Sequence, residues 1–385
     1  MKNQDKMNYT LYRVTLQVMK KGFTLATSTS NLNTIGIGGK YTSTSSSQRD
    51  KLKALELLKE RSLLHLEGPE SSDFLQGLIT NDMQHFKAGA ASMYSLFLNV
   101  KGRVLYDTIV YKAPEKETYY IECDKKVTEA LLKHLKLYKL RRKVNLDSIE
   151  DKMQVWTMFD ANIIPNLRNN VSEFGTPALE GQIFPCGTLN NKSSKYLDNV
   201  IVYEDPRLSQ LGFRILTRAN VRHEELAKYL NSSKSAEDNP TSYKAFRYKL
   251  GIGEGIEDLP PGKPLPLEIN CDYLRGISFH KGCYIGQELT ARTHHTGVVR
   301  KRLMPIIFHR ATDKTFQYDE NILDESGKVV GKFRGRKGDF GLGLIRITEA
   351  LGAQALTMSD VSIKVIKPWW WPQEQSKEKV SAGNK

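Results

Sequence analysis

Apolar and polar residues alternate in several short runs in the first half of the chain. This spacing predicts strands, because alternate side chains of an extended chain point to opposite faces. The runs are "SLLHLEG" at 62–68, "YSLFLNVKGRVLYDTIVY" at 94–111, "TYYIEC" at 118–123 and "KVNLDSI" at 143–149. In the second run, Lys-Gly-Arg at 101–103 predicts the turn of a β-hairpin.

Two stretches between these strands predict helices. Residues 125–142 carry apolar side chains at helical intervals, and a second helix is expected through 73–83, after the turn at 69–72. The order strand, helix, strands, helix, strand is typical of a ferredoxin-like unit, in which helices cover one face of an antiparallel sheet. We therefore expect an α+β protein whose first domain, at 50–150, is ferredoxin-like.

The rest of the chain predicts two further domains. Strand runs such as "MQVWTMF" and "VIVYED", followed by helical patterns, indicate a second α/β domain at 151–299 that carries a cysteine motif. From residue 300 on, the short strands "RLMPIIF", "GKVVGKFRG" and "VSIKVIK" with glycine-bearing turns predict a small closed β-barrel at 300–371. The polar tail at 372–385 is expected to be mobile.

Composition narrows the class of protein. With 385 residues, 39% of them hydrophobic, the chain can bury two or three cores. Its four cysteines lack CxxC spacing, so neither a structural zinc site nor a disulfide framework is expected, and a reducing compartment is the simpler interpretation. No run of about 18 apolar residues occurs, so no membrane span is expected.

The net charge of +14 is unevenly distributed. Residues 1–49 hold seven basic residues and one acidic residue, which leaves +8 for the remainder. This basic segment rich in serine and threonine predicts either a mitochondrial transit peptide or a disordered leader. The basic patches are not interleaved with aromatic platforms, so a nucleic-acid partner is not expected.

The stretch "FHKGCYIGQELTARTHHTG" places Cys283 between Gly282 and Gly286. Glycine allows backbone conformations that are closed to other residues, so the thiol is expected on a tight turn. A helix that begins at Gln287 or Glu288 places the thiol near a positive helix terminus.

Together with Lys281, that helix terminus favours the thiolate, the form that attacks disulfides and binds soft metal ions. The alternative is a small apolar residue that fills the turn. One thiol cannot hold an iron-sulfur cluster, so any cluster here is shared with a partner or transient. His294 and His295 are adjacent and diverge, so no metal site is expected from them.

One carboxylate lies in an apolar strand. Alternation puts Leu105, Asp107 and Ile109 on one face, with Val104, Tyr106, Thr108 and Val110 on the other. Burying Asp107 among aliphatic neighbours is costly unless hydrogen-bond donors meet it. Those donors are either the paired N–H groups of a heterocycle such as a pterin or backbone amides at the end of the sheet, and the pattern does not choose between them.

Taken together, "KGCYIGQELTAR", "LPLEINCDYLRGISF", "FLQGLITND" and "NVKGRVLYD" resemble the YgfZ family of iron-sulfur cluster assembly factors. The chain looks most like the mitochondrial branch of that family, which matures 4Fe-4S proteins. The match extends from about Lys51 to Trp371, and the run from Lys281 to Glu288 is highly specific for the family.

The resemblance implies a fold similar to the tetrahydrofolate-dependent aminomethyltransferase of glycine cleavage. In that fold, ferredoxin-like and mixed α/β domains surround a central folate site, and a β-barrel follows. The signature positions correspond to Lys281, Gly282, Cys283, Tyr284, Gly286, Gln287 and Glu288, with Arg292 following, and Cys283 is the reactive thiol. The folate-facing positions correspond to Tyr94 and Asp107.

The resemblance further implies a factor of the mitochondrial matrix that binds tetrahydrofolate. Its partners are other iron-sulfur assembly proteins and 4Fe-4S client proteins, and a cluster shared transiently is implied at Cys283. The alternative is an aminomethyltransferase of glycine cleavage. Two departures argue against that activity: Tyr106-Asp107 replaces a pair of aspartates, and Lys249 replaces an acid. Whether the protein is an enzyme stays open.

Overall fold

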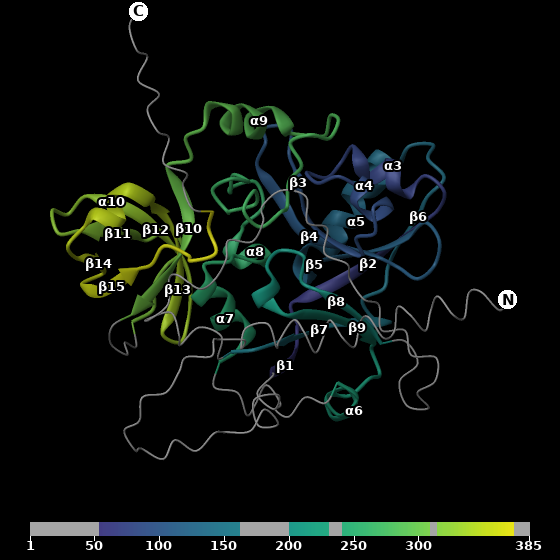
Figure 1. Cartoon of the computed structure of the whole chain (residues 1–385), viewed down its shortest axis with the longest axis horizontal. Coiled ribbons are helices and arrows are strands. Elements are labelled where there is room, and N and C mark those ends of the chain that lie inside the picture. Colours follow the sequence, from purple (N-terminus) through teal and green to yellow (C-terminus); the bar gives the residue numbers. More distant parts are fainter. Residues whose placement is uncertain (1–53, 162–199, 231–240, 309–313, 373–385) are drawn as a thin grey trace, which may run out of the picture.

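The computed structural model describes residues 54–161, 200–230, 241–308 and 314–372 (Figure 1). The expected leader at 1–49, Cys186 and the tail beyond Pro372 lie outside the described residues. Two antiparallel sheets and a closed barrel make up the described part, and the helices α7 (Tyr243–Leu250) and α8 (Gly255–Asp258) lie between them.

The first sheet is the predicted ferredoxin-like unit, with three strands between its helices. Its strand order is β3-β4-β5-β2-β6, and every neighbouring pair is antiparallel. The strands are β2 (Arg61–Glu67), β3 (Ser92–Leu98), β4 (Val104–Lys112), β5 (Thr118–Asp124) and β6 (Asn145–Ser148). The helices are α3 (Ser71–Gln76), α4 (Gln84–Lys87) and α5 (Thr128–Lys139).

Both faces of this sheet are buried. On one face, Leu64 and Ile121 pack with Phe74 of α3 and Leu131 of α5. The other face, which includes Ile109, packs against the rest of the molecule. Burial on both faces explains why β4 carries apolar side chains on each of them, such as Ile109 and Val110.

The expected alternation along β4 fails at its first residue. The register between β3 and β4 shifts after the pair Phe97 and Tyr106, as in a β-bulge. Val104 therefore lies in the same core as Ile109, although strict alternation places it on the opposite face with Val110.

The second sheet has the order β1-β7-β9-β8 and is also antiparallel. Its strands are β1 (Ala54–Leu57), β7 (Met153–Phe159), β8 (Ile201–Glu204) and β9 (Phe213–Arg218), and α6 (His223–Tyr229) follows β9. Strand β1 belongs to the segment expected as the first domain, yet it pairs with β7. Strand β1 therefore joins the second sheet, although its partner β7 begins about a hundred positions further along the chain.

The barrel closes in the order β10-β13-β12-β11-β14-β15, which confirms the predicted closed barrel. Its strands are β10 (Lys301–Phe308), β11 (Asn321–Asp324), β12 (Val329–Lys337), β13 (Phe340–Arg346), β14 (Leu356–Met358) and β15 (Val361–Val365), and α10 (Ile347–Gly352) packs on β12 and β13. Helix α7 packs on β10, β12 and β13 and so joins the barrel to the centre. Within the described ranges, no helix combines the length and hydrophobicity needed to cross a membrane.

Candidate functional site

The cysteine motif docks on the first domain, although the chain order places it in the second. The ammonium group of Lys281 donates hydrogen bonds to the backbone oxygens of Gln76, Ile79 and Asn81, at 2.7, 2.8 and 2.6 Å. The backbone N–H of Ile285 donates to the oxygen of Gly77 at 3.2 Å. Two of the segments that carry the family resemblance, 74–82 and 281–288, therefore form one unit in space.

This docking explains why one predicted helix is short. A helix was expected through 73–83, but α3 ends at Gln76 and the chain then runs through a loop. In a continuous helix, the carbonyl groups would accept from amides four residues further on. Here Lys281, about 200 positions away, donates to the carbonyl oxygen of Gln76 at the end of α3 and to those of Ile79 and Asn81 in the loop.

Gly286 brings the third segment, the β3–β4 turn, into the unit. Its φ of 79° lies in the left-handed region, and a β-carbon there would lie 2.9 Å from Cβ of Leu98 and 3.2 Å from Cα of Gly102. Glycine is therefore required at 286 for its conformation and for the close approach. Gly282 has open space around it and a φ outside the left-handed region, so only one of the two expected glycines is needed for the turn.

Cys283 is exposed on this turn, whereas Cys123 and Cys271 are buried. Burial raises the pKa of the Cys123 thiol to about 12 and that of the Cys271 thiol well above its usual value. A thiol that stays protonated is a poor nucleophile and a poor metal ligand. Among the described cysteines, Cys283 is the one that a second protein can reach.

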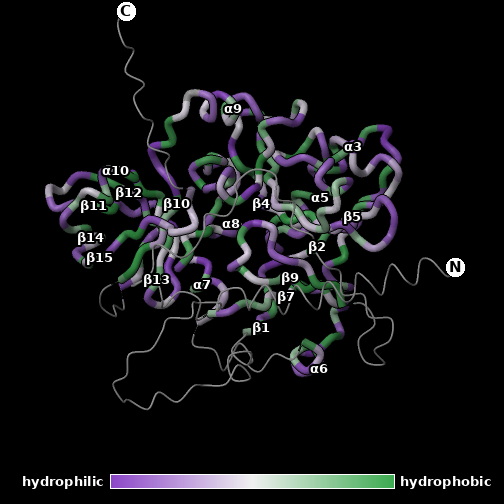
Figure 2. The backbone as a smooth tube through the Cα atoms, viewed as in Figure 1, coloured by the Kyte–Doolittle hydropathy of each residue, from purple (hydrophilic) through white to green (hydrophobic). Residues whose placement is uncertain are grey.

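Helix α9 (Gln287–Thr296) begins where the sequence predicted and carries the turn at its N-terminus (Figure 1). Gly286 is its N-cap, and the side-chain oxygen of Gln287 accepts from the backbone N–H of Tyr284 at 3.1 Å. Figure 2 shows polar colours along most of α9. The helix therefore orients the turn that holds Cys283 while remaining largely in solvent.

Lys281 cannot donate a hydrogen bond to the thiolate, because its three N–H groups already point at three carbonyl oxygens. Burial lowers the pKa of Lys281 to about 8. Its ammonium also lies 5.1 Å from the centre of the Tyr284 ring. Lys281 and Tyr284 therefore hold the turn in place.

The remaining motif residues are on the exposed side of α9. Glu288 and Arg292 form an exposed ion pair at 2.7 Å, four residues apart on the helix. Such a pair contributes about 0.3–0.5 kcal/mol. His294 stacks on Phe279, with ring centres 3.6 Å apart, and His295 packs edge-on against His294.

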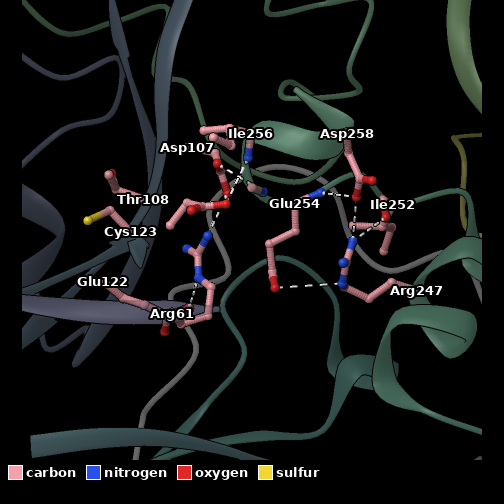
Figure 3. A network of polar contacts seen from close by, with 12 residues as sticks. Arg61, Asp107, Thr108, Glu122, Cys123, Arg247, Ile252, Glu254, Ile256 and Asp258 are labelled. Atoms are coloured by element: carbon pink, nitrogen blue, oxygen red, sulfur yellow. Dashed lines mark hydrogen bonds and ion pairs between the residues drawn. The ribbon is translucent and has the colours of Figure 1, made fainter. Parts of the chain in front are cut away.

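The second predicted site, around Asp107, is a buried network of charges (Figure 3). Arg61 donates to Glu122 at 2.7 Å and to Asp107 at 3.3 Å, and the backbone N–H of Gly255 donates to the other oxygen of Asp107 at 3.1 Å. Asp107 is 4% exposed. Burial raises its pKa, which the Arg61 guanidinium partly offsets. The Asp107 carboxylate therefore accepts hydrogen bonds from a side chain and from a backbone N–H of the protein itself.

The network extends across the centre through Glu254. Arg214 and Arg207 contact its carboxylate at 2.5 and 2.7 Å, and Arg247 lies at 3.6 Å. Burial alone would raise the pKa of Glu254, but these guanidinium groups hold it well below its usual value. Sequence reasoning missed these residues. A signal was present, because Glu122 and Arg214 interrupt apolar strand runs as Asp107 does.

Tyr94 and Asp107, the expected folate-facing residues, are both buried against groups of the protein itself. Both oxygens of Asp107 already accept hydrogen bonds, as described above. The Tyr94 side chain is 2% exposed, and a β-carbon on Gly276 would lie 2.6 Å from its ring. Arg207 lies over the same ring at 5.6 Å. Folate binding by these two residues stays a prediction of the resemblance, and their contacts argue against it.

Lys249 occupies the position at which the resemblance implies an acid in the aminomethyltransferase, and its side chain points to the barrel. Its ammonium is 5.4 Å from the ring of Phe340 in the barrel, and burial lowers its pKa. The residue therefore does not supply the negative charge that an aminomethyltransferase has at this position.

Comparison with known proteins decides the family. Residues 59–159 match the family described as GCVT N-terminal domain, and residues 300–373 match the family described as CAF17, C-terminal beta-barrel domain. The chain is 34% identical over 339 residues to the iron-sulfur cluster assembly factor IBA57, mitochondrial, of Mus musculus, a match that covers 82% of this chain and 84% of that protein. The chain belongs to the IBA57 family. The predicted resemblance to the mitochondrial branch of the YgfZ family is confirmed.

Further relatives agree. The IBA57 protein of Homo sapiens is 36% identical over 329 residues, again with 82% of this chain and 84% of that protein covered. The homolog from Dictyostelium discoideum is 31% identical over 299 residues, covering 71% of this chain and 67% of that one. The solved structure of glycine cleavage system aminomethyltransferase T from Bartonella henselae has a TM-score of 0.58 at 14% identity and covers 82% of this chain and 86% of that chain. This likeness concerns the fold, and it confirms the predicted aminomethyltransferase-like fold.

Proposed function

We propose that the chain is an iron-sulfur cluster assembly factor of the mitochondrial matrix that supports the maturation of 4Fe-4S proteins through the thiol of Cys283. The observation that carries this proposal is the exposed thiol on a turn held by Lys281 and Gly286, at the start of α9. The names of the relatives, which are mitochondrial iron-sulfur cluster assembly factors, support the process and the organelle.

In this proposal, Cys283 supplies one sulfur ligand to iron. The thiol loses its proton to solvent, and the thiolate forms one Fe–S bond with a cluster that a partner protein presents. A cluster usually needs four protein ligands, so the partner holds the other positions. Within the described ranges, no set of three His, Cys, Asp or Glu side chains suited to a metal is found.

The surroundings of Cys283 suit a protein partner. Val100, in the β3–β4 turn, is 82% exposed, and Leu289 on α9 is 37% exposed. The β3–β4 turn meets α9 here, because a β-carbon on Gly102 would lie 3.0 Å from Cβ of Leu289. Exposed apolar side chains beside a reactive group favour docking of another protein surface.

Aminomethyl transfer is the less favoured alternative. In that reaction, an aspartate at position 107 orients the folate, but Asp107 here is bound to Arg61 and to the backbone of Gly255. The reaction also has no evident use for the exposed thiol. The contacts of Asp107 and the exposed thiol therefore both favour the assembly role over transfer of a one-carbon unit.

A complementation experiment tests the proposal. In cells depleted of the protein, the Cys283→Ser and Cys283→Ala variants are expected to fold but to leave 4Fe-4S enzymes inactive. A Val298→Ser variant serves as the control, since Val298 is 61% exposed just beyond the end of α9. Unchanged melting temperatures of the purified variants exclude a folding defect. Full rescue by either cysteine variant would remove the thiol from the proposed function.

A further inference from the structure

The end of α5 and the loop after it form a basic surface on the first domain, on the side of the molecule away from the barrel (Figure 1). Residues 133–143 include no acidic residue and six basic ones, namely Lys133, Lys136, Lys139, Arg141, Arg142 and Lys143. Five of these side chains are exposed, and Lys139 is partly buried. Arg142 lies 3.9 Å from exposed Glu70, and within the described part of the chain the other five form no ion pair. The surface is therefore strongly positive.

Two leucines protrude from this basic surface. Leu137 is 70% exposed and Leu140 is 85% exposed. Residues four apart share a face of a helix, so Leu137 lies beside Lys133, and Leu140 follows Lys136 at the same interval. The opposite side of α5 packs in the core of the first domain, and neither leucine belongs to that core. Their exposure is therefore not needed to bury α5.

Hydrogen bonds fix the turn that presents Leu140. Its φ of 49° is positive, which is uncommon for a residue other than glycine. The backbone N–H of Arg142 donates to the oxygen of Lys139 at 3.0 Å, and that of Lys143 donates to the Glu70 carboxylate at 2.6 Å. The turn thus holds a leucine in solvent at a cost in backbone strain. An exposed apolar side chain held in this way indicates a surface that meets another body.

Exposed leucines among unpaired cations fit the surface of an anionic bilayer. Clusters of about four to eight Lys and Arg residues on a helix are attracted to anionic lipid headgroups, and leucine side chains enter the boundary between headgroups and acyl chains. The long stem of lysine lets its ammonium group stay at the headgroups while a neighbouring leucine inserts. An acidic protein surface fits less well, because lysine is depleted in protein–protein interfaces.

We propose that the surface at 133–143 binds peripherally to a bilayer that contains anionic lipids. The six cations contact the headgroups, and Leu137 and Leu140 insert between them. The helix lies along the membrane surface. This inference does not depend on the role proposed for Cys283, because the surface shares no residue with the cysteine motif.

Co-sedimentation of the full chain with lipid vesicles tests the proposal. The protein is expected to bind vesicles made of equal amounts of phosphatidylcholine and phosphatidylglycerol, to bind more weakly as salt is raised, and not to bind phosphatidylcholine alone. The double variant Lys133→Gln with Lys136→Gln is expected to bind the anionic vesicles about tenfold more weakly, since it removes two of the cations. The basic leader at 1–49 is the same in every variant, so it does not account for a difference between them.

A second double variant separates a bilayer from an acidic protein as the partner. Leu137→Ser with Leu140→Ser keeps every charge and is expected to bind the anionic vesicles about tenfold more weakly, because it removes the side chains that insert. The control is Lys228→Gln with Lys364→Gln, which removes two exposed lysines from α6 and β15 and is expected to bind as the wild type does.

Four results would overturn the proposal. Absence of binding to the anionic vesicles at low salt would remove the site, and wild-type binding by the Lys133 and Lys136 variant would place the contact elsewhere. Equal weakening by the control variant would show general attraction to a basic protein. Wild-type binding by the leucine variant would exclude insertion and favour an acidic protein partner instead. Unchanged melting temperatures of the three variants keep these outcomes separate from misfolding.

Discussion

Gly286 packs against Gly102, so that a β-carbon on Gly286 would lie 3.2 Å from Cα of Gly102. The first of these glycines starts the helix behind the exposed cysteine, and the second belongs to the β3–β4 turn. Their contact places the thiol of a late segment on the surface of the first domain. The position of Cys283 therefore depends on packing between parts of the chain that are nearly 200 residues apart.

The Gly286→Ala variant is expected to lower the free energy of unfolding by about 1–3 kcal/mol, because an L-residue is strained at this φ and its β-carbon meets the Leu98 side chain. Urea denaturation measures this change. Gly282→Ala is the matched control two residues before Tyr284, and it is expected to stay within about 0.5 kcal/mol of the wild type. Equal losses in both variants would contradict the assignment of the strained position to Gly286.

The Lys281→Met variant is expected to destabilise the turn and to change the alkylation rate of Cys283. It removes a donor from three backbone oxygens, and an unsatisfied buried acceptor costs about 1–3 kcal/mol. Lys101→Met, which changes an exposed lysine in the neighbouring hairpin turn, is the control. Denaturation together with the rate of iodoacetamide reaction checks both effects. Wild-type stability of Lys281→Met would show that the three hydrogen bonds are dispensable.

Stability is also expected to depend on pH through Lys281. Burial lowers its pKa from 10.5 to about 8 in the folded state, so between these two values the unfolded chain binds more protons than the folded chain. Stability then rises with pH across this window, and below pH 8 the cost of burying the charge is fully present. The difference in unfolding free energy between the wild type and Lys281→Met, measured from pH 7.5 to 10, is expected to shift in favour of the wild type. A difference that is flat with pH would refute this linkage.

The Arg61→Met variant is expected to lose about 3–5 kcal/mol of stability, because it leaves the buried carboxylates of Asp107 and Glu122 without this cation. Exposed Arg141→Met makes the same chemical change in a loop and is expected to stay within about 0.5 kcal/mol. Thermal and urea denaturation of the two variants give the comparison. A loss below 1 kcal/mol for Arg61→Met would show that the network does not stabilise the centre.

Asp107→Asn is expected to leave any binding of tetrahydrofolate unchanged, because the Asp107 carboxylate is buried and is bound by Arg61 and by the backbone of Gly255. Calorimetric titration of the wild type and the variant with reduced folate measures this. Circular dichroism confirms that the variant is folded. Binding that weakens about tenfold or more in a folded Asp107→Asn protein would place the folate at this carboxylate after all.

Local patterns were sufficient for much of the fold. The strands β2 to β6 follow from alternating runs, and the barrel follows from short strands with glycine-bearing turns. The start of α9 was also predictable, since Gly286 precedes a polar helical run. Each of these features depends on residues close together in the chain.

The errors have a common physical cause, which is interaction over long sequence separations. The helix expected through 73–83 stops at Gln76, and Lys281 donates to the carbonyl oxygens of Gln76, Ile79 and Asn81. Strand β1 was placed with the first domain but pairs with β7. The donors to Asp107 come from Arg61, 46 positions earlier, and from Gly255, 148 positions later.

The sequence by itself determined most of the strands, several helices and the motif that marks the family, because hydrophobic periodicity, turn chemistry and motif spacing are local properties. Only the tertiary structure decided that the cysteine motif lies on the first domain and that the central aspartate is bound by the protein's own arginine and backbone. The physical reason is that hydrogen bonds and buried ion pairs are satisfied by whichever groups packing brings within about 3 Å, and the order of residues along the chain does not specify those partners.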